Sequence, residues 1–467
     1  MCLLGVLEAL AAISNYIPSV RKPARRPSLP ARLAWTGLIV ILYLIMSEIP
    51  LLGVPVTGAQ TSPTLASILL GMTTGSLMTL GIGPIVTAGI VLEVLVGGGL
   101  LKLDLTKPRD RRLFMGAQRT LALFFAAFEA SMYALGCTFW VPALGGGITA
   151  CPATPMQRVG VVVQLVLVTM LLLWFDELSR KGWGLGSALS LFIVANVAKG
   201  MFWEIGGPIL APGPANTQQY YGVLAEAILN GNWAGVVLRK GLPDLIGLIM
   251  TFVIIAVLVY LQLMRVYIPI ASPRMGTIRS RIPLQFLYVT NIPILFVAIF
   301  VADIQVFAGI AAALGGPANP IAQALHMLAT YMTPPRGLLN VVSEPLRALT
   351  SAIAWITLSI VFGFIWVEVA GLSPEKQAEN IVKSGLQIPG IRRSTRLLAK
   401  LLERYIYSLT LISSIIVGVI AVTADFFGAY GSGSGLVLTV GIVYNFYLTL
   451  AYERTLEMYP VLRRLIS

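Results

Sequence analysis

The feature that most constrains this chain is a series of apolar segments, each about long enough to cross a lipid bilayer. A spanning helix needs roughly 20 predominantly apolar residues, and ten segments of about this length lie between Leu33 and Tyr452. Only 11% of the 467 residues are charged, whereas soluble proteins carry about 25%. We therefore predict an all-α polytopic membrane protein and exclude a water-soluble enzyme. The predicted spans are Leu33–Ile49, Thr79–Val96, Leu113–Leu135, Arg158–Phe175, Gly184–Phe202, Leu242–Met264, Pro283–Ala302, Leu346–Val369, Arg404–Thr423 and Leu436–Tyr452.

The basic residues predict how the spans are oriented. Most of the 33 Lys and Arg residues lie in segments that would share one side of the membrane. Basic loops remain cytoplasmic in membrane proteins, so we expect both termini to be cytoplasmic. The shared segments are 1–32, 97–112, 176–184, 265–284, 371–404 and 453–467.

These spans divide the chain into five parts. Residues 1–32 form a cytoplasmic amphipathic segment, in which Leu3–Ile17 has the spacing of a helix lying on the membrane surface. Spans one to five occupy residues 33–203, and spans six to ten occupy residues 242–452. An external linker, 204–241, joins these halves, and a cytoplasmic tail, 453–467, follows the last span.

Two neighbouring segments depart from a plain spanning helix. The apolar piece Pro63–Leu70 is too short to cross the bilayer, so we expect a re-entrant segment covered by protein or lining a cavity. In the segment Thr79–Ile90, Pro84 predicts a kink, and Ile82 and Val86 share one helical face. The glycines of this segment favour either close helix packing or an aliphatic constriction that excludes ions by dewetting.

The residues that chemistry would need are scarce. His326 is the only histidine and is expected at the surface of an external loop, so a zinc site of the H-E-x-x-H type is excluded. The sequence contains no P-loop motif, and Gly431–Gly435 is expected to form a turn. We expect no enzymatic activity, no cofactor and no metal.

Two further features leave alternatives open. Glu129 is the one carboxylate that falls in the middle of a span, which is weak support for an ion-coupled transporter. Cys137 and Cys151 lie near or in one external loop, where they are either free thiols or a disulfide.

The basic loops 265–284 and 371–404 also allow two interpretations. Their charge either only orients the chain in the membrane, or it forms a docking surface for a polyanion such as ribosomal RNA. The second loop carries the run Ile388–Arg396, with Arg392 and Arg393.

The segment Thr79–Ile90, together with the short apolar piece before it, closely resembles the SecY family, which forms the large subunit of the Sec protein-conducting channel. Further matching motifs follow in the same order along the chain as in the family. Their sequences are similar to those of the archaeal branch. They are Gly184–Ile193, Met264–Pro269, Tyr288–Pro293, Phe364–Glu368 and Gly435–Val440.

The resemblance implies two pseudo-symmetric halves of five helices around a central pore that opens sideways toward lipid. It implies a pore ring, a plug, a polar cluster at the lateral gate and ribosome contacts. The ring would be Ile82, Val86, Leu189, Ile193, Leu295 and Leu438; the plug would be Ser62, Pro63, Thr64, Leu65, Ala66, Ser67, Ile68, Leu69, Leu70 and Gly71; the gate cluster would be Thr87, Glu129 and Asp303; and the ribosome contacts would be Arg274, Arg281, Arg392 and Arg393.

Asp303 departs from the family pattern, because relatives commonly carry an amide there. The implied partners are a SecE clamp subunit, a Sec-beta subunit, the ribosome and its RNA, nascent polypeptides with signal sequences, and membrane lipids. The implied location is the plasma membrane.

The expected function is passive passage of unfolded polypeptides across the membrane, with release of apolar segments into lipid. Since the chain has no nucleotide site, a partner such as the ribosome would drive transport. A secondary transporter of small solutes is the main alternative, and a scaffold or insertase without a continuous pore is another.

Overall fold

The fold is given by a computed structural model of the chain. It describes residues 2–24, 27–55, 73, 75–101, 103, 107–136, 139–140, 153–210, 219–271, 279–289, 291–315, 319–383 and 394–458.

A helix lies at the position of each predicted span. Eight of the described helices are long and apolar enough to cross a membrane; the other two are α4, which has only 15 residues, and α5, which carries several charged residues. The structure is therefore the expected all-α membrane fold. The helices are α2 (Leu29–Glu48), α4 (Gly83–Gly97), α5 (Pro108–Leu135), α6 (Pro155–Leu178), α7 (Ala188–Gly206), α9 (Leu245–Leu263), α10 (Asn291–Gly315), α13 (Pro345–Val369), α15 (Thr395–Phe426) and α16 (Gly433–Met458).

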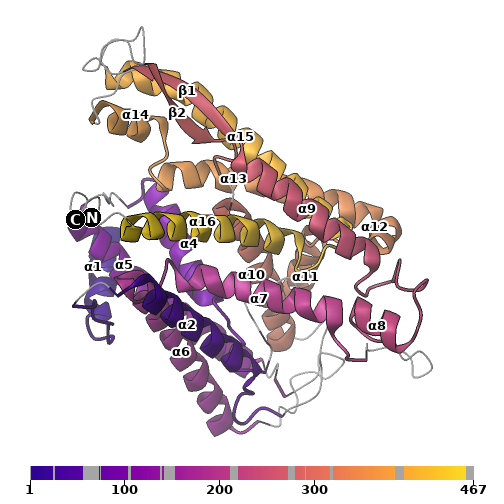
Figure 1. The fold of residues 1–467 in the computed structure, drawn as a ribbon. Helices are drawn as coiled ribbons and strands as arrows, with labels where there is room; N and C mark the ends of the chain where they lie inside the picture. Colours follow the sequence, from indigo (N-terminus) through magenta and orange to yellow (C-terminus); the bar gives the residue numbers. More distant parts are fainter. Residues whose placement is uncertain are drawn as a thin grey trace.

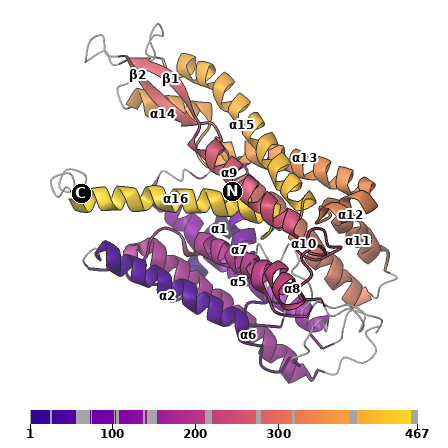
Figure 2. The same ribbon diagram turned by 45° about the vertical axis from the view of Figure 1, so that its right-hand side comes forward.

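The helices form two groups with α16 between them. Helices α2, α5 and α6 lie on one side, and α9, α13 and α15 lie on the other (Figures 1 and 2). Helix α16 contacts α7 from the first half of the chain and α9, α10 and α15 from the second half. The largest apolar core accordingly contains residues from both groups, among them Tyr43, Phe192 and Trp355.

Small residues let the helices of the first group approach one another. Four alanines spaced four residues apart along α5 are all buried. Alanine at such positions allows close helix packing in a membrane, and α5 contacts both α4 and α6. The four are Ala122, Ala126, Ala130 and Ala134.

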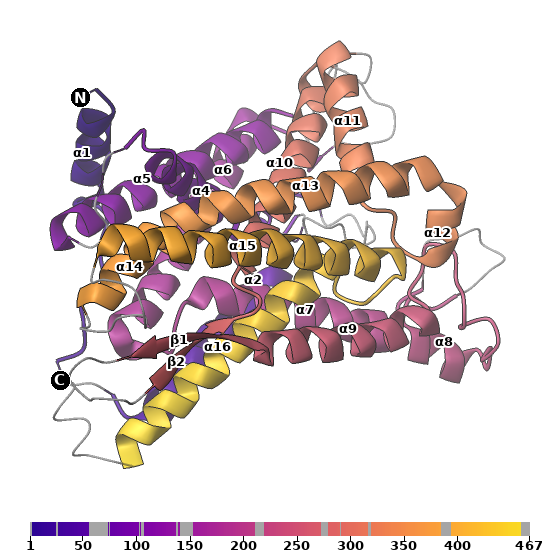
Figure 3. The ribbon, with the colours of Figure 1, turned by 90° about the horizontal axis from the view of Figure 1, so that it is seen from above.

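Shorter elements complete the structure at the two ends of the spanning helices. Helix α1, helix α14 and the hairpin of β1 and β2 lie at one end, and α8 and α12 lie at the other (Figures 1 and 3). Helix α11 runs beside α10. Their bounds are α1 (Cys2–Ser14), the π-helical turn η2 (Ser179–Trp183), α8 (Val223–Leu229), β1 (Arg265–Ala271), β2 (Arg279–Gln285), α11 (Pro320–Met332), α12 (Leu338–Ser343) and α14 (Pro374–Lys383).

Helix α1 confirms that the segment Leu3–Ile17 contains a helix, although this helix ends at Ser14. It packs on α5, where the Thr120 hydroxyl donates to the Leu10 carbonyl at 2.9 Å, and Ala11 lies against Gly116. Its buried Leu7 belongs to a small apolar cluster with Leu92 of α4.

The predicted start of the seventh span at Pro283 is wrong. Residues 279–285 form strand β2, which pairs antiparallel with β1, and Pro283 stands opposite Tyr267. Strand β1 is rich in β-branched and aromatic residues, and proline is tolerated in both strands because both strands of a two-stranded sheet are edge strands. The helix begins only at Asn291, with Pro293 in its first turn.

The predicted start of the ninth span at Arg404 is also wrong. Helix α15 begins at Thr395, so part of the predicted loop 371–404 is helical. Leu398, Leu402 and Ile406 are spaced by four residues and bury one face against Ala378 of α14 and Val367 of α13. This spacing is typical of an amphipathic helix.

Candidate functional site

Helix α4 begins inside the protein rather than at its surface, since Gly83, Pro84 and Ile85 are all buried. The residues just before it, including Met78 and Leu80, are buried and form turns whose amides bond locally, such as Gly81 N to Met78 O at 3.0 Å. Ile82 is the N-cap of the helix. Non-helical backbone at such depth is tolerated only where protein or a cavity covers it, so this segment is suited to a position beside a central pore.

The predicted kink at Pro84 is wrong. Pro84 lies in the first turn of α4, where the amide hydrogen that proline lacks would have no helical partner anyway. Pro84 therefore starts the helix without bending it.

The six predicted ring residues lie in one core cluster. Three of them are buried, namely Ile82 (1% exposed), Ile193 (4%) and Leu438 (1%). The other three are partly buried against that same cluster: Val86, Leu189 and Leu295. None of the six is on the exposed exterior.

Four helices supply these six residues, and each contributes them near its beginning. Leu189 and Ile193 lie in the first two turns of α7, Leu295 in the second turn of α10, and Leu438 in the second turn of α16. Phe192, next to Ile193, stacks on Tyr43 with ring centroids 4.4 Å apart. This stack supports the α7 side of the aliphatic cluster.

The three predicted gate residues come together from α4, α5 and α10. The Thr87 hydroxyl donates to Asp303 Oδ2 at 3.4 Å and so joins α4 to α10. Glu129 of α5 lies close enough to Asp303 for the two carboxyl groups to repel each other when both are ionised. The cluster therefore combines an attractive contact between α4 and α10 with a contact between α5 and α10 that is repulsive when both groups carry a charge.

Glycines set the spacing of α4 from its neighbours. A Cβ on Gly89 would lie 2.9 Å from Gln118 Nε2 of α5. A Cβ on Gly97 would lie 2.1 Å from Val369 Cγ2 of α13. The structure therefore shows close helix packing at Gly89 and Gly97 and, at the same helix, a buried Ile82.

Several predicted residues lie outside the described part of the chain. These are the whole predicted plug, Ser62–Gly71, the arginines Arg274, Arg392 and Arg393, and the cysteines Cys137 and Cys151. Arg281 lies in β2, where it is the pairing partner of Pro269. His326 is exposed on α11, as expected.

Sequence reasoning missed a buried polar network that links the two helix groups. Glu204, at the end of α7, is 2% exposed and pairs with Arg336 Nη2 at 3.1 Å. Its other oxygen accepts from the Gly431 amide at 2.8 Å, and Arg336 also donates to the Ala429 carbonyl. Asp425, at the end of α15, is fully buried and accepts from the Gly433 amide at 2.8 Å.

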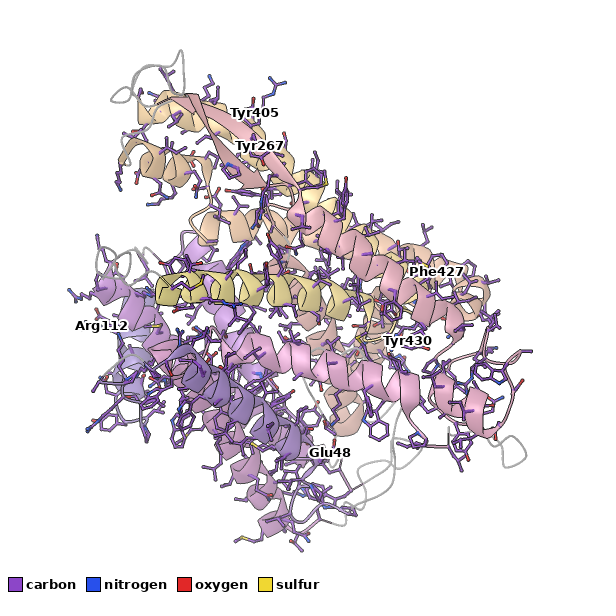
Figure 4. All side chains as sticks on the ribbon, viewed as in Figure 1. Glu48, Arg112, Tyr267, Tyr405, Phe427 and Tyr430 are labelled. Carbon is purple, nitrogen blue, oxygen red and sulfur yellow. The ribbon has the colours of Figure 1, made fainter. Side chains whose placement is uncertain are left out.

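Two tyrosines line this network and stay neutral. Burial, assisted by the nearby Glu204 carboxylate, raises the pKa of both Tyr221 and Tyr430. Tyr430 donates its hydroxyl hydrogen to the Asp244 carbonyl at 2.8 Å and lies in the loop just before α16 (Figure 4). In the sequence, Glu204 and Arg336 are isolated charges 132 residues apart. The one sequence feature that could have indicated a structural role is that each lies at the edge of an apolar run.

A second missed contact joins α2 to α16 at the opposite end of the molecule. Arg32 is 8% exposed, donates to the Gly184 carbonyl at 3.1 Å and pairs with Glu453 at 3.1 Å. The loop that carries Gly184 directly precedes α7. Arg32 therefore anchors the α7 side of the aliphatic cluster as well as the last helix.

A family model, a relative and two solved structures all indicate the same family for this chain. The SecY family model matches residues 76–447. The protein translocase subunit SecY of Aeropyrum pernix is 47% identical over 464 residues, which covers 99% of each chain. A structure described as that of a protein conducting channel has a TM-score of 0.77 at 33% identity and covers 96% of this chain and 98% of its own. Sec61 in the canine ribosome-channel complex from the endoplasmic reticulum has a TM-score of 0.74 at 32% identity, with the same shares covered.

Proposed function

The chain belongs to the SecY family, and on that basis we propose how its aliphatic cluster conducts a polypeptide. The chain is the pore-forming subunit of a protein translocase, a multi-pass membrane protein and not an enzyme. We place it in the plasma membrane. The observation that carries the proposal is that six aliphatic side chains from four helices, three of them buried and three partly buried, gather in one core cluster.

Aliphatic side chains suit a constriction that must pass many different sequences. They form no hydrogen bonds with a passing chain, so they do not hold it, and a narrow apolar constriction excludes ions by dewetting. We propose that the ring of Ile82, Val86, Leu189, Ile193, Leu295 and Leu438 opens around the polypeptide and closes behind it. We further propose that Ser62–Gly71 is the plug that covers the closed ring.

The lateral gate lies, in this proposal, between α4 and α10. The Thr87–Asp303 hydrogen bond holds these helices together, whereas a charge on Glu129 of the neighbouring α5 would repel an ionised Asp303 on α10. A segment of about 20 apolar residues gains free energy by entering lipid, whereas a polar segment stays in the pore. Sorting of the substrate therefore needs no chemical step.

Transport needs an external driving force, because the sequence carries no P-loop motif. The structure of the similar Sec61 is that of a ribosome-channel complex, and we propose the translating ribosome as a partner of this chain. Arg274, Arg281, Arg392 and Arg393 would bind phosphates of its RNA. The other proposed partners are a SecE clamp subunit, a Sec-beta subunit, nascent chains with signal sequences, and lipids.

Ion leak through reconstituted vesicles tests the ring. The double substitution of Ile82 and Leu295 by Gly removes two side chains from the constriction and should raise the leak of the idle channel severalfold. Phe252 is 65% exposed on α9, and Phe252→Gly is the matched control that should leave the leak unchanged. Equal leak in the wild type and in the double variant would reject the ring.

Ribosome affinity tests the docking arginines independently. Reversing the charge of Arg392 and Arg393 to Glu should weaken co-sedimentation with ribosomes by about tenfold or more and reduce its salt dependence. Co-sedimentation equal to that of the wild type would reject this role while leaving the ring intact.

The alternative of a secondary transporter of small solutes gains no support. The similar proteins reported above are a translocase subunit and protein channels.

A further inference from the structure

Between α7 and α9, residues 219–244 combine buried charged side chains with exposed large apolar ones. Glu226 (3% exposed) and Arg239 (7%) are buried, whereas Ile228 (67%) and Trp233 (65%) are exposed. A loop that faces water has the opposite arrangement. The order of these side chains therefore indicates the medium around the segment.

The buried charges hold the segment in one conformation. Glu226 accepts hydrogen bonds from the Tyr220 amide at 2.7 Å and from Asn230 Nδ2 at 2.9 Å. Arg239 donates to the carbonyls of Tyr220, Tyr221 and Pro243 at 2.6 to 3.2 Å. These contacts close the segment on itself, so its described part is a folded unit.

The inner apolar face docks the same unit on the spanning helices. Val223, Ala227 and Val236 pack with Tyr430 in one buried cluster, which also includes Met201 and Ile205 of α7 and Leu248 of α9. Helix α8 consequently lies beyond the ends of α7 and α9 at one end of the molecule (Figure 1). Its exposed face is therefore held in one direction relative to α7 and α9.

The outer face is apolar with a sparse polar border. Its exposed apolar residues are Leu224, Ile228, Leu229, Trp233, Val237 and Leu238. Among residues 219–244, all of which the structure describes, Lys240 is the one exposed charged residue, beside the exposed amides Gln219, Asn230 and Asn232.

Exposed apolar side chains are also found on the two spanning helices that flank this segment in the sequence. Phe202 (70% exposed) and Trp203 (37%) cover the end of α7, and Ile249 (55%) and Phe252 (65%) cover α9. Both helices are long and apolar enough to cross a bilayer. Tryptophan and lysine are residues that membrane proteins place at the interface between lipid and water.

We propose that residues 223–238 form an anchor that lies in the membrane interface, with Leu224, Ile228 and Trp233 inserted among the lipid acyl chains near the headgroups. An amphipathic segment buries its apolar face about 5–10 Å into this region. The anchor connects α7 to α9, so its depth in the membrane sets the depth at which these two helices are connected. It rests on the membrane assignment and not on the proposed ring.

Fluorescence quenching by brominated lipids tests the anchor. The full chain, with its partner subunits, is reconstituted in phosphatidylcholine vesicles brominated either near the headgroup or near the acyl-chain terminus. The contribution of Trp233 is obtained by subtracting the emission of Trp233→Phe. We expect that contribution to be quenched about twofold more by bromine near the headgroup, as an interfacial depth requires.

The control is Trp355, which is fully buried; the emission lost in Trp355→Phe should be insensitive to both lipids. Two results would overturn the proposal. Quenching of Trp233 by aqueous iodide but by neither lipid would place the face in water. Protection of Trp233 from both lipids only when the partner subunits are present would identify a protein as the occupant.

Discussion

Two pairs of charged residues join elements that are distant in the sequence, and each pair has at least one buried member. Glu204 of α7 meets Arg336 from the loop before α12, and Arg32 of α2 meets Glu453 of α16. Both pairs also bond to backbone groups, which partly compensates the free energy lost on removing the charges from water. Such pairs stabilise one relative position of the elements that they join.

Replacing Arg336 by Met should destabilise the protein strongly. The change leaves Glu204 buried and unpaired, and breaking a buried pair costs about 3–5 kcal/mol. Unfolding by denaturant in detergent would measure the loss. The control is Lys383→Met, because Lys383 and Glu379 form an exposed pair at 3.4 Å, with side chains 74% and 45% exposed; such pairs contribute about 0–1 kcal/mol. Equal losses in the two variants would contradict the role of the network.

Replacing Asp303 by Asn should favour the closed gate. The amide oxygen can still accept from Thr87, while the repulsion with Glu129 disappears. We expect leak through the idle channel to fall about fivefold, which corresponds to about 1 kcal/mol of coupling between contacting residues. The effect should be lost in a Glu129→Gln background, and an undiminished effect there would contradict the coupling of the two carboxylates.

The sequence predicted the members of these clusters unevenly. Thr87, Glu129 and Asp303 were expected together only through the family resemblance, and the structure brings them together. Glu204, Arg336 and Asp425 were not expected together. Their pairing depends on how α7, α15 and the loop before α12 end, and apolar periodicity within one segment does not contain this information.

At the scale of elements, α4 shows what a short helix contributes. It begins inside the protein, presents Ile82 at its N-terminus and contacts α5, α10 and α13. The position at which α4 begins therefore determines where its residues of the candidate ring and of the candidate gate lie.

Replacing Gly97 by Ala should push α4 away from α13. The new Cβ would lie 2.1 Å from Val369 Cγ2, and overpacking of this kind costs about 1–3 kcal/mol. We expect a lower unfolding midpoint and a higher idle leak. Gly37 of α2 is exposed with nothing within 4 Å of an added Cβ, so Gly37→Ala is the control. An unchanged midpoint and leak in Gly97→Ala would show that the α4–α13 contact is not tight.

The existence of the helices was predictable, but some of their ends were not. Apolar length places a helix at each predicted span, because the bilayer imposes that length. The hairpin of β1 and β2 and the early start of α15 lie outside the apolar runs, where local pairing and packing on α14 decide the structure. Hydropathy does not report either interaction.

At the scale of the whole molecule, α16 and the buried network connect the two helix groups. Helix α16 contacts both groups, and the loop before it carries Tyr430 and Gly431, which bond to α9 and α7 residues. The candidate gate lies between α4 and α10, and the hydrogen bonds of the Tyr430 and Gly431 amides go to neither of these helices. This arrangement is suited to opening at the gate while the other contacts persist.

Photo-crosslinking of a ribosome-stalled nascent chain tests the central claim most directly. A photoreactive residue placed at Ile82 or Leu438 should crosslink to the translocating polypeptide, because these side chains are proposed to surround the path of that polypeptide. The same residue at Phe252, which is exposed on α9, should crosslink to lipid and not to the nascent chain. Crosslinks to the nascent chain at Phe252, with none at Ile82 or Leu438, would contradict the account.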